Sequence, residues 1–230
     1  MYQWRPPGEK IFENRRVAGK ELASALLRRG DKFSAVLGLT RGGVPLAFEV
    51  ASALHVPMDV IVIKKLRTPG NPELALGAVS ADGAKVLREE IIRQLGVTAE
   101  YLARETELRT TEAKDEERKY RGKHTPLELK GQSVVIVDDG IATGSSVEAA
   151  VLSARNRGAR SITVATPVAS RESCSNLRRV ADDVFCLTTP TDFWAVGMFY
   201  RDFSQTADDE VRQLLDQSRS QTTGTSAPAP

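Results

Sequence analysis

The sequence predicts an α/β fold with a doubly wound, mainly parallel sheet of five strands. Short apolar runs rich in β-branched residues alternate along the chain with longer stretches of helical periodicity. Runs this apolar are typical of strands covered on both faces, as the strands of parallel sheets are. The joints between the runs are short, which favours helices that cross over one face and return the chain to the same sheet.

Length and composition exclude several classes of protein. The 230 residues are 41% hydrophobic and 27% charged, and 32 basic residues stand against 30 acidic ones, as in an ordinary globular protein. This balance predicts neither nucleic acid nor a membrane as a partner. Cys174 and Cys186 lack a CxxC spacing, so we expect no disulfide framework and no zinc site. No apolar run reaches the ~20 residues of a membrane span and no signal peptide is evident, so we expect a cytoplasmic protein; homo-oligomerisation stays open.

Five runs are the predicted strands, and four stretches are predicted helices. The strands are residues 35–39, 60–63, 133–137, 161–165 and 183–187. Residues 14–29 carry apolar side chains at fourfold spacing before Gly30, a candidate C-cap. The other predicted helices are residues 45–54, which open at a proline, 145–157, which end before a glycine, and 207–215.

An insertion interrupts this alternation over about residues 66–124. Two apolar runs, 76–79 and 84–87, flank the sequence SADG, which is a hairpin signal. A long charged stretch with Thr98 as a candidate N-cap follows, and we expect either a solvated helical arm or a mobile flap over a site. The chain is thus one domain over residues 1–217, with a hood and helix over about 189–217. Residues 218–230, rich in Ser, Thr, Pro and Ala, are expected to be disordered.

The strongest functional signal is the segment VVIVDDGIATGSS at residues 134–146. A buried strand delivers Asp138 and Asp139 to its carboxyl end, and small residues then lead into a helix. Backbone amides, hydroxyls and the helix N-terminus favour an anion there. The carboxylates beside this cradle would accept hydrogen bonds from vicinal hydroxyls and suit a hydroxyl-bound Mg²⁺. The segment therefore predicts a sugar phosphate as ligand, because a phosphate alone would be repelled by the acids.

Other phosphate-binding folds have less support. An apolar strand that ends in acids also occurs in P-loop NTPases and in phospho-acceptor receiver domains. The chain has no G-x-x-x-x-G-K-[ST], and a receiver domain would not follow its aspartate with the loop Thr-Gly-Ser-Ser. It has no G-x-G-x-x-G either, which removes the main support for a dinucleotide fold.

Two further segments follow strands of the same predicted sheet. Residues 37–45, LGLTRGGVP, are a strand, a glycine-rich turn with Arg41, and a helix start; a tight βα turn alone also explains this pattern. Residues 63–67, IKKLR, close the next strand, and solvated lysines alone also explain that pattern. Ligands of doubly wound sheets bind outside the carboxyl ends of the strands, so all three segments share one rim. That rim predicts a ligand with two separated phosphate groups joined by a hydroxylated sugar.

These motifs resemble those of the type I phosphoribosyltransferases. Residues 135–144 are similar to the family's motif for phosphoribosyl pyrophosphate (PRPP), and residues 40–43 resemble its pyrophosphate loop; the resemblance covers about residues 14–187. The pieces RGGVP, NPELALGA and DFWAVG also resemble a bacterial branch of predicted phosphoribosyltransferases. The resemblance implies a type I phosphoribosyltransferase-like fold and a Mg²⁺-dependent transferase. In the family reaction a nitrogen nucleophile, usually a nucleobase, displaces pyrophosphate from C1 of PRPP with inversion.

The resemblance also implies roles for single residues. Asp138 and Asp139 would hold the ribose hydroxyls and would contact Mg²⁺ mostly through PRPP and water. With these acids, Arg41 and Lys64 are the candidate catalytic residues. The candidate PRPP-binding residues are Arg41, Gly42, Gly43, Lys64, Lys65, Arg67, Asp138, Asp139, Gly140, Ala142, Thr143, Gly144, Ser145 and Ser146.

The family places acceptor specificity in a hood, built here from the N-terminal segment and residues 189–203. Phe193 and Trp194 are the candidate acceptor-binding residues, and anchoring of the C-terminal helix is the alternative role for at least half of the aromatic residues there. The insertion would close over the site and exclude water. No spacing selects a general base among Glu105, Asp115 and Glu117.

The expected partners are PRPP and an unidentified small-molecule acceptor. Two other functions stay open at this stage. One is a non-catalytic regulator that senses PRPP or a nucleotide on the same fold, and the other is recognition of a related phosphosugar such as ribose 5-phosphate.

Overall fold

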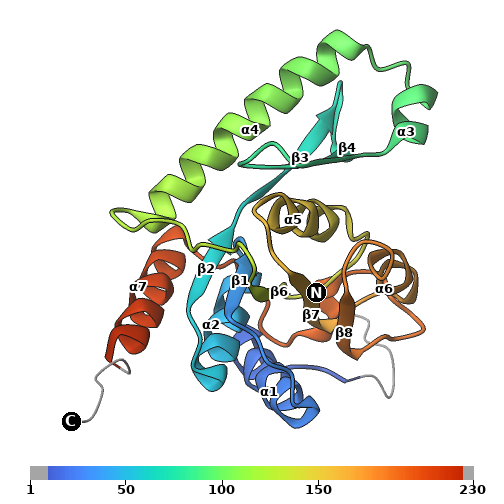
Figure 1. Ribbon diagram of the computed structural model, residues 1–230. Helices are drawn as coiled ribbons and strands as arrows, with labels where there is room; N and C mark the ends of the chain where they lie inside the picture. The colour runs from blue at the N-terminus through green and yellow to red at the C-terminus, as the bar shows by residue number, and fades with distance from the viewer. Residues whose placement is uncertain (1–9, 225–230) are drawn as a thin grey trace.

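Five parallel strands form the central sheet in the order β2-β1-β6-β7-β8 (Figure 1). The computed structural model describes residues 10–224. The strands are β1 (Ala35–Leu39), β2 (Met58–Ile61), β6 (Ser133–Val137), β7 (Ser161–Val168) and β8 (Asp183–Thr188). From β1 the chain proceeds to one side of the sheet, and from β6 to the other, so the topological switch point lies between β1 and β6. The predicted doubly wound parallel sheet is therefore confirmed.

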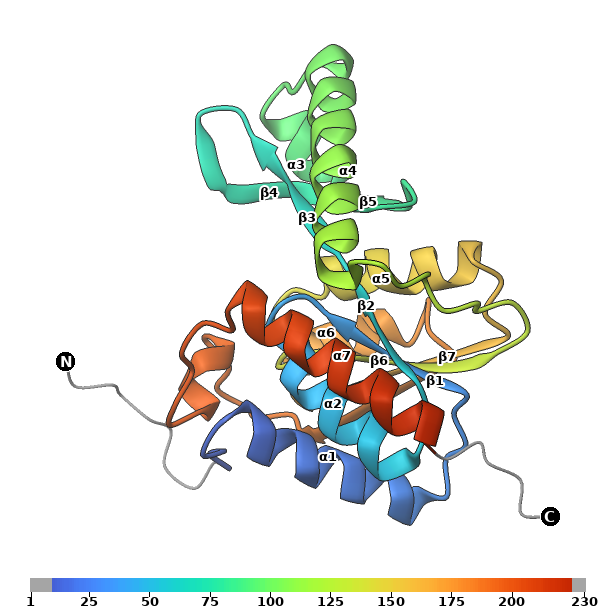
Figure 2. The same ribbon diagram turned by 90° about the vertical axis from the view of Figure 1, so that its left-hand side faces the viewer.

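Helices cover both faces of this sheet. On one face lie α1 (Arg15–Arg29), α2 (Gly43–Leu54) and α7 (Asp208–Gly224), and on the other lie α5 (Ser145–Asn156) and α6 (Arg171–Leu177) (Figure 2). Alternate residues of each strand enter the two cores, so that Val36 packs on the first face and Leu37 on the second. The predicted C-terminal end of α1 is confirmed, because Gly30 is its C-cap with a φ of 76°.

The insertion is a second, smaller layer, which we call the flap (residues 63–121). Its antiparallel sheet contains β3 (Ile63–Thr68), β4 (Asn71–Ser80) and β5 (Lys85–Leu87), followed by α3 (Glu89–Gln94) and α4 (Ala99–Arg121). The hairpin and the Thr98 cap are as predicted. The strand predicted over residues 60–63 exists as β2, but its predicted end was wrong, because β2 stops at Ile61 and Ile63 already belongs to β3 in the other sheet.

The flap stands away from the central sheet but is tied to it at the base of α4 (Figure 2). Asp59 on β2 is fully buried and accepts hydrogen bonds from Arg121 Nε, at 2.9 and 3.1 Å, and from the Leu127 amide at 3.0 Å. Breaking a buried pair of this kind costs about 3–5 kcal/mol. The arm is therefore solvated along its outer side and fixed at its base.

The hood consists of residues 10–13 and 189–203, the two segments that the sequence predicted to form it, and hydrogen bonds connect them. The Phe12 amide donates to Phe199 O at 2.8 Å, and the Arg201 amide donates to Phe12 O at 2.9 Å. A short 3₁₀ helix, η1 (Val196–Phe199), completes it. Phe199 and Tyr200 are almost fully buried and belong to the same apolar core as Val211, Leu214 and Leu215 of α7, which agrees with the alternative role in packing the C-terminal helix.

The chain stays helical beyond Ser218, where we expected disorder. Helix α7 continues to Gly224, and Ser218 is 3% exposed. Val211, Leu214 and Leu215 precede it at helical spacing on the same buried face, and a composition rich in serine conceals this periodicity. The rest of the predicted tail, 225–230, and the first nine residues of the predicted domain lie outside the described residues. Within residues 10–224, no helix has the length and apolarity needed to cross a bilayer.

Candidate functional site

Two loops meet at the switch point, one after β1 and one after β6. Because β1 and β6 are paired, residues 40–42 and 138–144 leave the sheet side by side. A methyl group on Gly42 would lie under 3.0 Å from the carboxylate of Asp139, and one on Gly43 would lie under 3.0 Å from Val137 O. Position 43 requires glycine because the two backbones approach so closely, whereas a side chain at position 42 would displace the Asp139 carboxylate. The structure thus brings the Arg41 loop onto the acidic pair, as predicted.

Both loops end at helix N-termini that no side chain caps. Gly42 precedes α2 and Gly144, with a φ of 80°, precedes α5, and neither helix has a side-chain cap. In contrast, α1, α4 and α6 are capped by side chains, those of Asn14, Thr98 and Ser170. The first amides of an α-helix have no acceptor within the helix and carry its partial positive charge. Two anion cradles therefore face the switch point, one on each side of the acidic pair.

A cavity of about 160 Å³ lies at the α5 cradle. Its lining comes from three parts of the chain: the loop after β6, the flap and the hood. The residues are Lys65, Asp138, Gly140, Ile141, Ala142, Thr143, Gly144, Ser146, Val147 and Val196. Ala142 and Thr143 are exposed at its rim. Seven of the predicted PRPP-binding residues thus share one cavity.

The flap lysines point in opposite directions. Successive side chains of a strand alternate between its faces, and β3 lies between α4 on one side and α5 on the other. Lys65 lines the cavity, whereas the Lys64 ammonium pairs with Glu116 on α4. The prediction that Lys64 is catalytic therefore loses its basis, because its charge is already paired on the far face of β3.

Arg67 lies farther along the flap, at an irregularity in the pairing of β3 with β4. Its amide donates to Glu105 Oε1 at 2.9 Å and its carbonyl accepts from the Tyr101 hydroxyl at 3.1 Å, while its side chain is exposed. The three acids considered as a general base are also engaged elsewhere: Glu105 pairs with Arg109, Asp115 with Arg118 and Glu117 with Arg121.

The acidic pair is held from both sides. Asp139 Oδ2 accepts from Arg15 Nε at 2.8 Å, and these side chains are 13% and 12% exposed. The Asp139 carbonyl accepts from the Tyr200 hydroxyl at 2.6 Å, and Asp138 Oδ1 accepts from the Asp139 amide at 2.9 Å. The pair is thus fixed in position while an edge of it faces the cavity.

Burial is the main cause of the pKa shifts of Asp138 and Asp139. Loss of solvent raises the pKa of Asp138 well above its usual range, and the charge of Asp139 raises it further. Burial also raises the pKa of Asp139, and the Arg15 guanidinium opposes that rise. The ionised pair is therefore costly without a ligand, and donors such as sugar hydroxyls would stabilise it.

Sequence reasoning missed Arg15 and Tyr200. Arg15 lies 124 positions from Asp139, and nothing in its local pattern separates it from any helix-surface arginine. In the structure its guanidinium lies 3.9 Å over the Phe203 ring and donates to Ser204 O at 2.6 Å. Arg15 therefore links α1, the acidic pair and the end of the hood.

Arg41 lies at the second cradle, close to the base of the flap. Its guanidinium is 3.3 Å from Asp208 Oδ1 at the start of α7. Asp208 also accepts from the Tyr120 hydroxyl at 2.9 Å and pairs with the Lys119 ammonium. Hydrogen bonds from Lys119 and Tyr120, with the charges of Lys119 and Arg41, lower the pKa of Asp208 to about 2. Lys119, which the sequence did not reveal, is thus a second cation on Asp208, beside Arg41.

The donor set fits Mg²⁺ bound chiefly through a ligand. Among residues 10–224, no group of three or more His, Cys, Asp and Glu side chains is placed to hold a metal ion. Mg²⁺ prefers one or two carboxylates with ligand phosphates and water, and Asp138 and Asp139 supply the carboxylates beside both cradles. That they would hold the ion indirectly, through the ligand and water, stays a prediction.

The two candidate acceptor-binding residues differ in exposure. Phe193 is partly buried and stacks on Phe199, with ring centroids 5.4 Å apart. Trp194 is 78% exposed, two residues before Val196 at the cavity. Phe193 therefore packs the hood, whereas the Trp194 side chain is largely exposed to solvent.

Comparisons with known proteins agree with this arrangement. Residues 9–204 match the model of the family described as "Phosphoribosyl transferase domain". Two Mycobacterium tuberculosis proteins, from strains CDC 1551 and H37Rv, each named "Putative phosphoribosyl transferase", are 42% identical over 209 residues, which cover 91% of this chain and 47% of theirs. The chain thus spans about half the length of these curated relatives. The crystal structure of TT1426 from Thermus thermophilus is 42% identical with a TM-score of 0.76, over 90% of this chain and 98% of that one.

Proposed function

Since the chain belongs to the phosphoribosyl transferase domain family, we propose that it is a Mg²⁺-dependent enzyme that transfers the phosphoribosyl group of PRPP to a nitrogenous acceptor. One observation carries this proposal: two uncapped helix N-termini lie on either side of one acidic pair. PRPP has the matching sequence of groups, with phosphate, hydroxylated ribose and pyrophosphate in a row.

Each part of PRPP has a place on this chain. The amides of residues 142–146 and the hydroxyls of Thr143, Ser145 and Ser146 would bind the 5-phosphate. Asp138 and Asp139 would accept from the ribose hydroxyls, with Arg15 holding Asp139 in place. The amides at the start of α2, with Arg41, would bind pyrophosphate, and Lys65 would add positive charge from the cavity on the α5 side of the acidic pair.

The reaction breaks the bond between C1 and the pyrophosphate oxygen and forms a bond between C1 and the acceptor nitrogen, which then loses its proton. An oxocarbenium-like transition state leaves developing negative charge on the leaving group. The cations Arg41 and Lys65 and the α2 dipole would stabilise that charge. Mg²⁺, when bound, supplies further charge neutralisation at the pyrophosphate. Because Lys65 and Val196 enter the cavity from the flap and the hood, the same elements exclude water from C1.

The acceptor would stack on Trp194, the exposed aromatic ring of the hood. Replacing Trp194 by Ala should raise the KM for the acceptor and leave PRPP affinity unchanged. Phe193→Ala is the matched control, and it should lower stability because that ring packs on Phe199.

The test of the proposal is pyrophosphate release from PRPP and Mg²⁺ over a panel of nucleobases and other nitrogen nucleophiles. Release that requires one acceptor, and that is lost in Asp139→Asn, would support the transferase. PRPP binding with no release over the whole panel would contradict it and favour a PRPP-sensing role on the same fold.

A further inference from the structure

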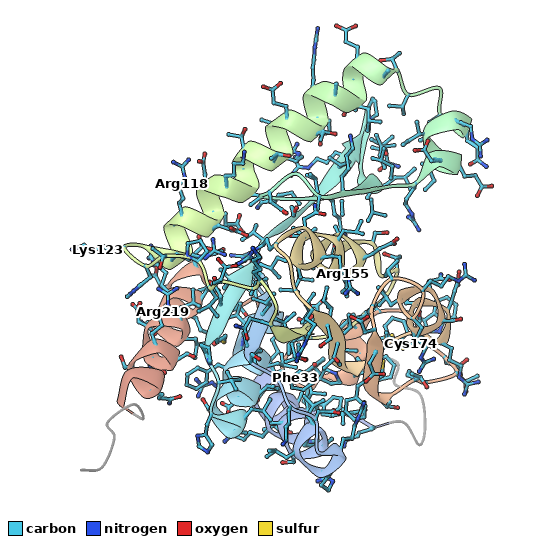
Figure 3. The ribbon with its side chains drawn as sticks, viewed as in Figure 1. Phe33, Arg118, Lys123, Arg155, Cys174 and Arg219 are labelled. Atoms are coloured by element: carbon cyan, nitrogen blue, oxygen red, sulfur yellow. The ribbon has the colours of Figure 1, made fainter. Side chains whose placement is uncertain are left out.

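Two thiols lie in contact beside the 5-phosphate cradle. Cys174 on α6 and Cys186 on β8 have their Sγ atoms 2.8 Å apart, and both are free thiols. Cys174 is 2% exposed, and Cys186 is partly exposed on β8, the edge strand of the sheet. Figure 3 shows Cys174 on α6, next to β8. None of the roles proposed above uses this pair.

Helix α6 also holds the cradle in shape. The hydroxyls of Ser170 and Ser173 both donate to Ala142 O, at 3.0 and 2.5 Å. The Ser170 amide donates to Ile141 O at 3.0 Å, so the first turn of α6 fixes residues 141 and 142. Ser173 directly precedes Cys174 in the chain. A displacement of Cys174 therefore moves the hydroxyls that position the cradle.

The surroundings of Cys174 favour its thiolate. The hydrogen bond from Cys186, helped by the charge of Arg178, lowers the pKa of Cys174 to about 7 in spite of its burial. The pKa of Cys186 moves the other way, because of its contact with Cys174, its burial and the nearby charge of Asp183. Near neutral pH one sulfur is thus a nucleophile and the other keeps its proton, which is the combination that disulfide formation needs.

We propose that Cys174 and Cys186 are an oxidation site whose reversible disulfide weakens binding at the 5-phosphate cradle. The cradle's ligand rests on the proposed function, whereas the oxidation site itself does not. With a peroxide as oxidant, the thiolate of one cysteine attacks one peroxide oxygen to give a sulfenic acid and, after protonation, water. The thiol of the other cysteine then displaces that oxygen, giving the disulfide and a second water. Two thiols and one hydrogen peroxide thus yield one disulfide and two waters.

The disulfide would change the cradle because its sulfurs must approach to ~2.05 Å. The sulfurs now lie 2.8 Å apart, so they must approach further, by rotation of the two side chains together with movement of α6 and β8 toward each other. Movement of α6 lengthens the bonds from Ser170 and Ser173 to Ala142 O. We therefore expect about fivefold weaker binding of ribose 5-phosphate, which corresponds to the loss of one such bond at about 1 kcal/mol.

The first part of the test is chemical and needs no ligand. The full chain is treated with hydrogen peroxide under native conditions, and the thiols and intact mass are measured before and after reduction. We expect the monomer to lose both free thiols and the mass of two hydrogen atoms, and to regain them with dithiothreitol. Cys186→Ser and Cys174→Ser should form no intramolecular bond. Two thiols that stay free, or that form only intermolecular bonds, would overturn the proposal.

The second part measures the cradle in the reduced and oxidised protein. Calorimetric titration with ribose 5-phosphate should show weaker binding after oxidation, with no change for Cys186→Ser given the same treatment. Equal affinity in both states would overturn the link to the cradle. Hydrogen exchange of amides 141–146 provides a readout without ligand, and faster exchange after oxidation is expected. If the reduced protein bound no phosphosugar, the proposed function would fail, while thiol counts and exchange would still decide this inference.

Discussion

The ion pair between Arg15 and Asp139 makes a quantitative prediction about both stability and binding. Its atoms are 2.8 Å apart, and its two side chains are 12% and 13% exposed. Exposed pairs contribute about 0.2–1 kcal/mol, and breaking a fully buried pair costs about 3–5 kcal/mol. A pair with this exposure lies between these limits, so we expect each single substitution, Arg15→Met or Asp139→Asn, to cost about 2 kcal/mol. For a chain of this length that lowers Tm by roughly 4–8 °C.

The assay is a double-mutant cycle by urea unfolding at one pH and salt concentration. The wild type, both single variants and the double variant give a coupling energy, which we expect at about 1–2 kcal/mol. The double variant should be less destabilised than the sum of the single variants, because the second change removes a group that has already lost its partner. Free energies that add within about 0.5 kcal/mol would refute the pairing.

The same pair controls the pH dependence of binding. Burial raises the pKa of Asp139 and Arg15 holds it down, so Arg15→Met should raise that pKa further. The carboxylate then takes up a proton at higher pH, and PRPP binding should fall off at a higher pH than in the wild type as the solution is acidified. An unchanged pH midpoint would mean that Arg15 does not tune this carboxyl.

Three further predictions follow from neighbouring contacts. Lys65→Ala should weaken PRPP binding about tenfold, because the Lys65 side chain lines the cavity. Lys64→Ala should mainly lower stability, because the Lys64 ammonium pairs with Glu116. Equal losses of PRPP binding would contradict the assignment of these lysines to opposite faces of β3. Asp208→Asn should lower the free energy of unfolding by a constant amount above about pH 4. This loss should shrink as the pH falls towards 2, because the contacts that lower the pKa of Asp208 stabilise the fold only while its carboxyl is ionised. A loss that does not change between about pH 4 and about pH 2 would refute this. Gly140→Ala should disturb the hood and lower PRPP affinity, since its methyl would lie under 3.0 Å from Val196 Cγ1. Adding Val196→Ala should restore most of that affinity. If it does not, contact with Val196 is not the cause of the loss.

The central sheet and the two cradles were predictable because their signals are local. Each strand that ends in the site is followed within a few residues by its own glycine-rich turn and helix start, so residues 37–45 and 134–146 could be interpreted alone. Their meeting follows from topology, because parallel strands bring their carboxyl ends to one rim.

The errors arise where a role depends on a distant partner or on a sheet boundary. Lys64 and Lys65 are adjacent and chemically equal, and only the start of β3 at Ile63 decides which of them faces the cavity. Arg15, Tyr200 and Asp208 reach the site from segments distant in sequence, and no spacing indicates those contacts. The thiol pair was likewise hidden, since the crossover through α6 brings the two sulfurs together.

The most direct test of the site is calorimetric titration of PRPP, with and without Mg²⁺, into the wild type and Gly42→Ala. This substitution changes no charge and adds one methyl group against the Asp139 carboxylate, and its unfolding temperature shows whether the fold is kept. We predict Mg²⁺-dependent binding to the wild type that is tighter than that of ribose 5-phosphate or pyrophosphate alone, and its loss in folded Gly42→Ala. No PRPP binding by the folded wild type, or equal affinity in the variant, would contradict a PRPP site at the junction of the two loops.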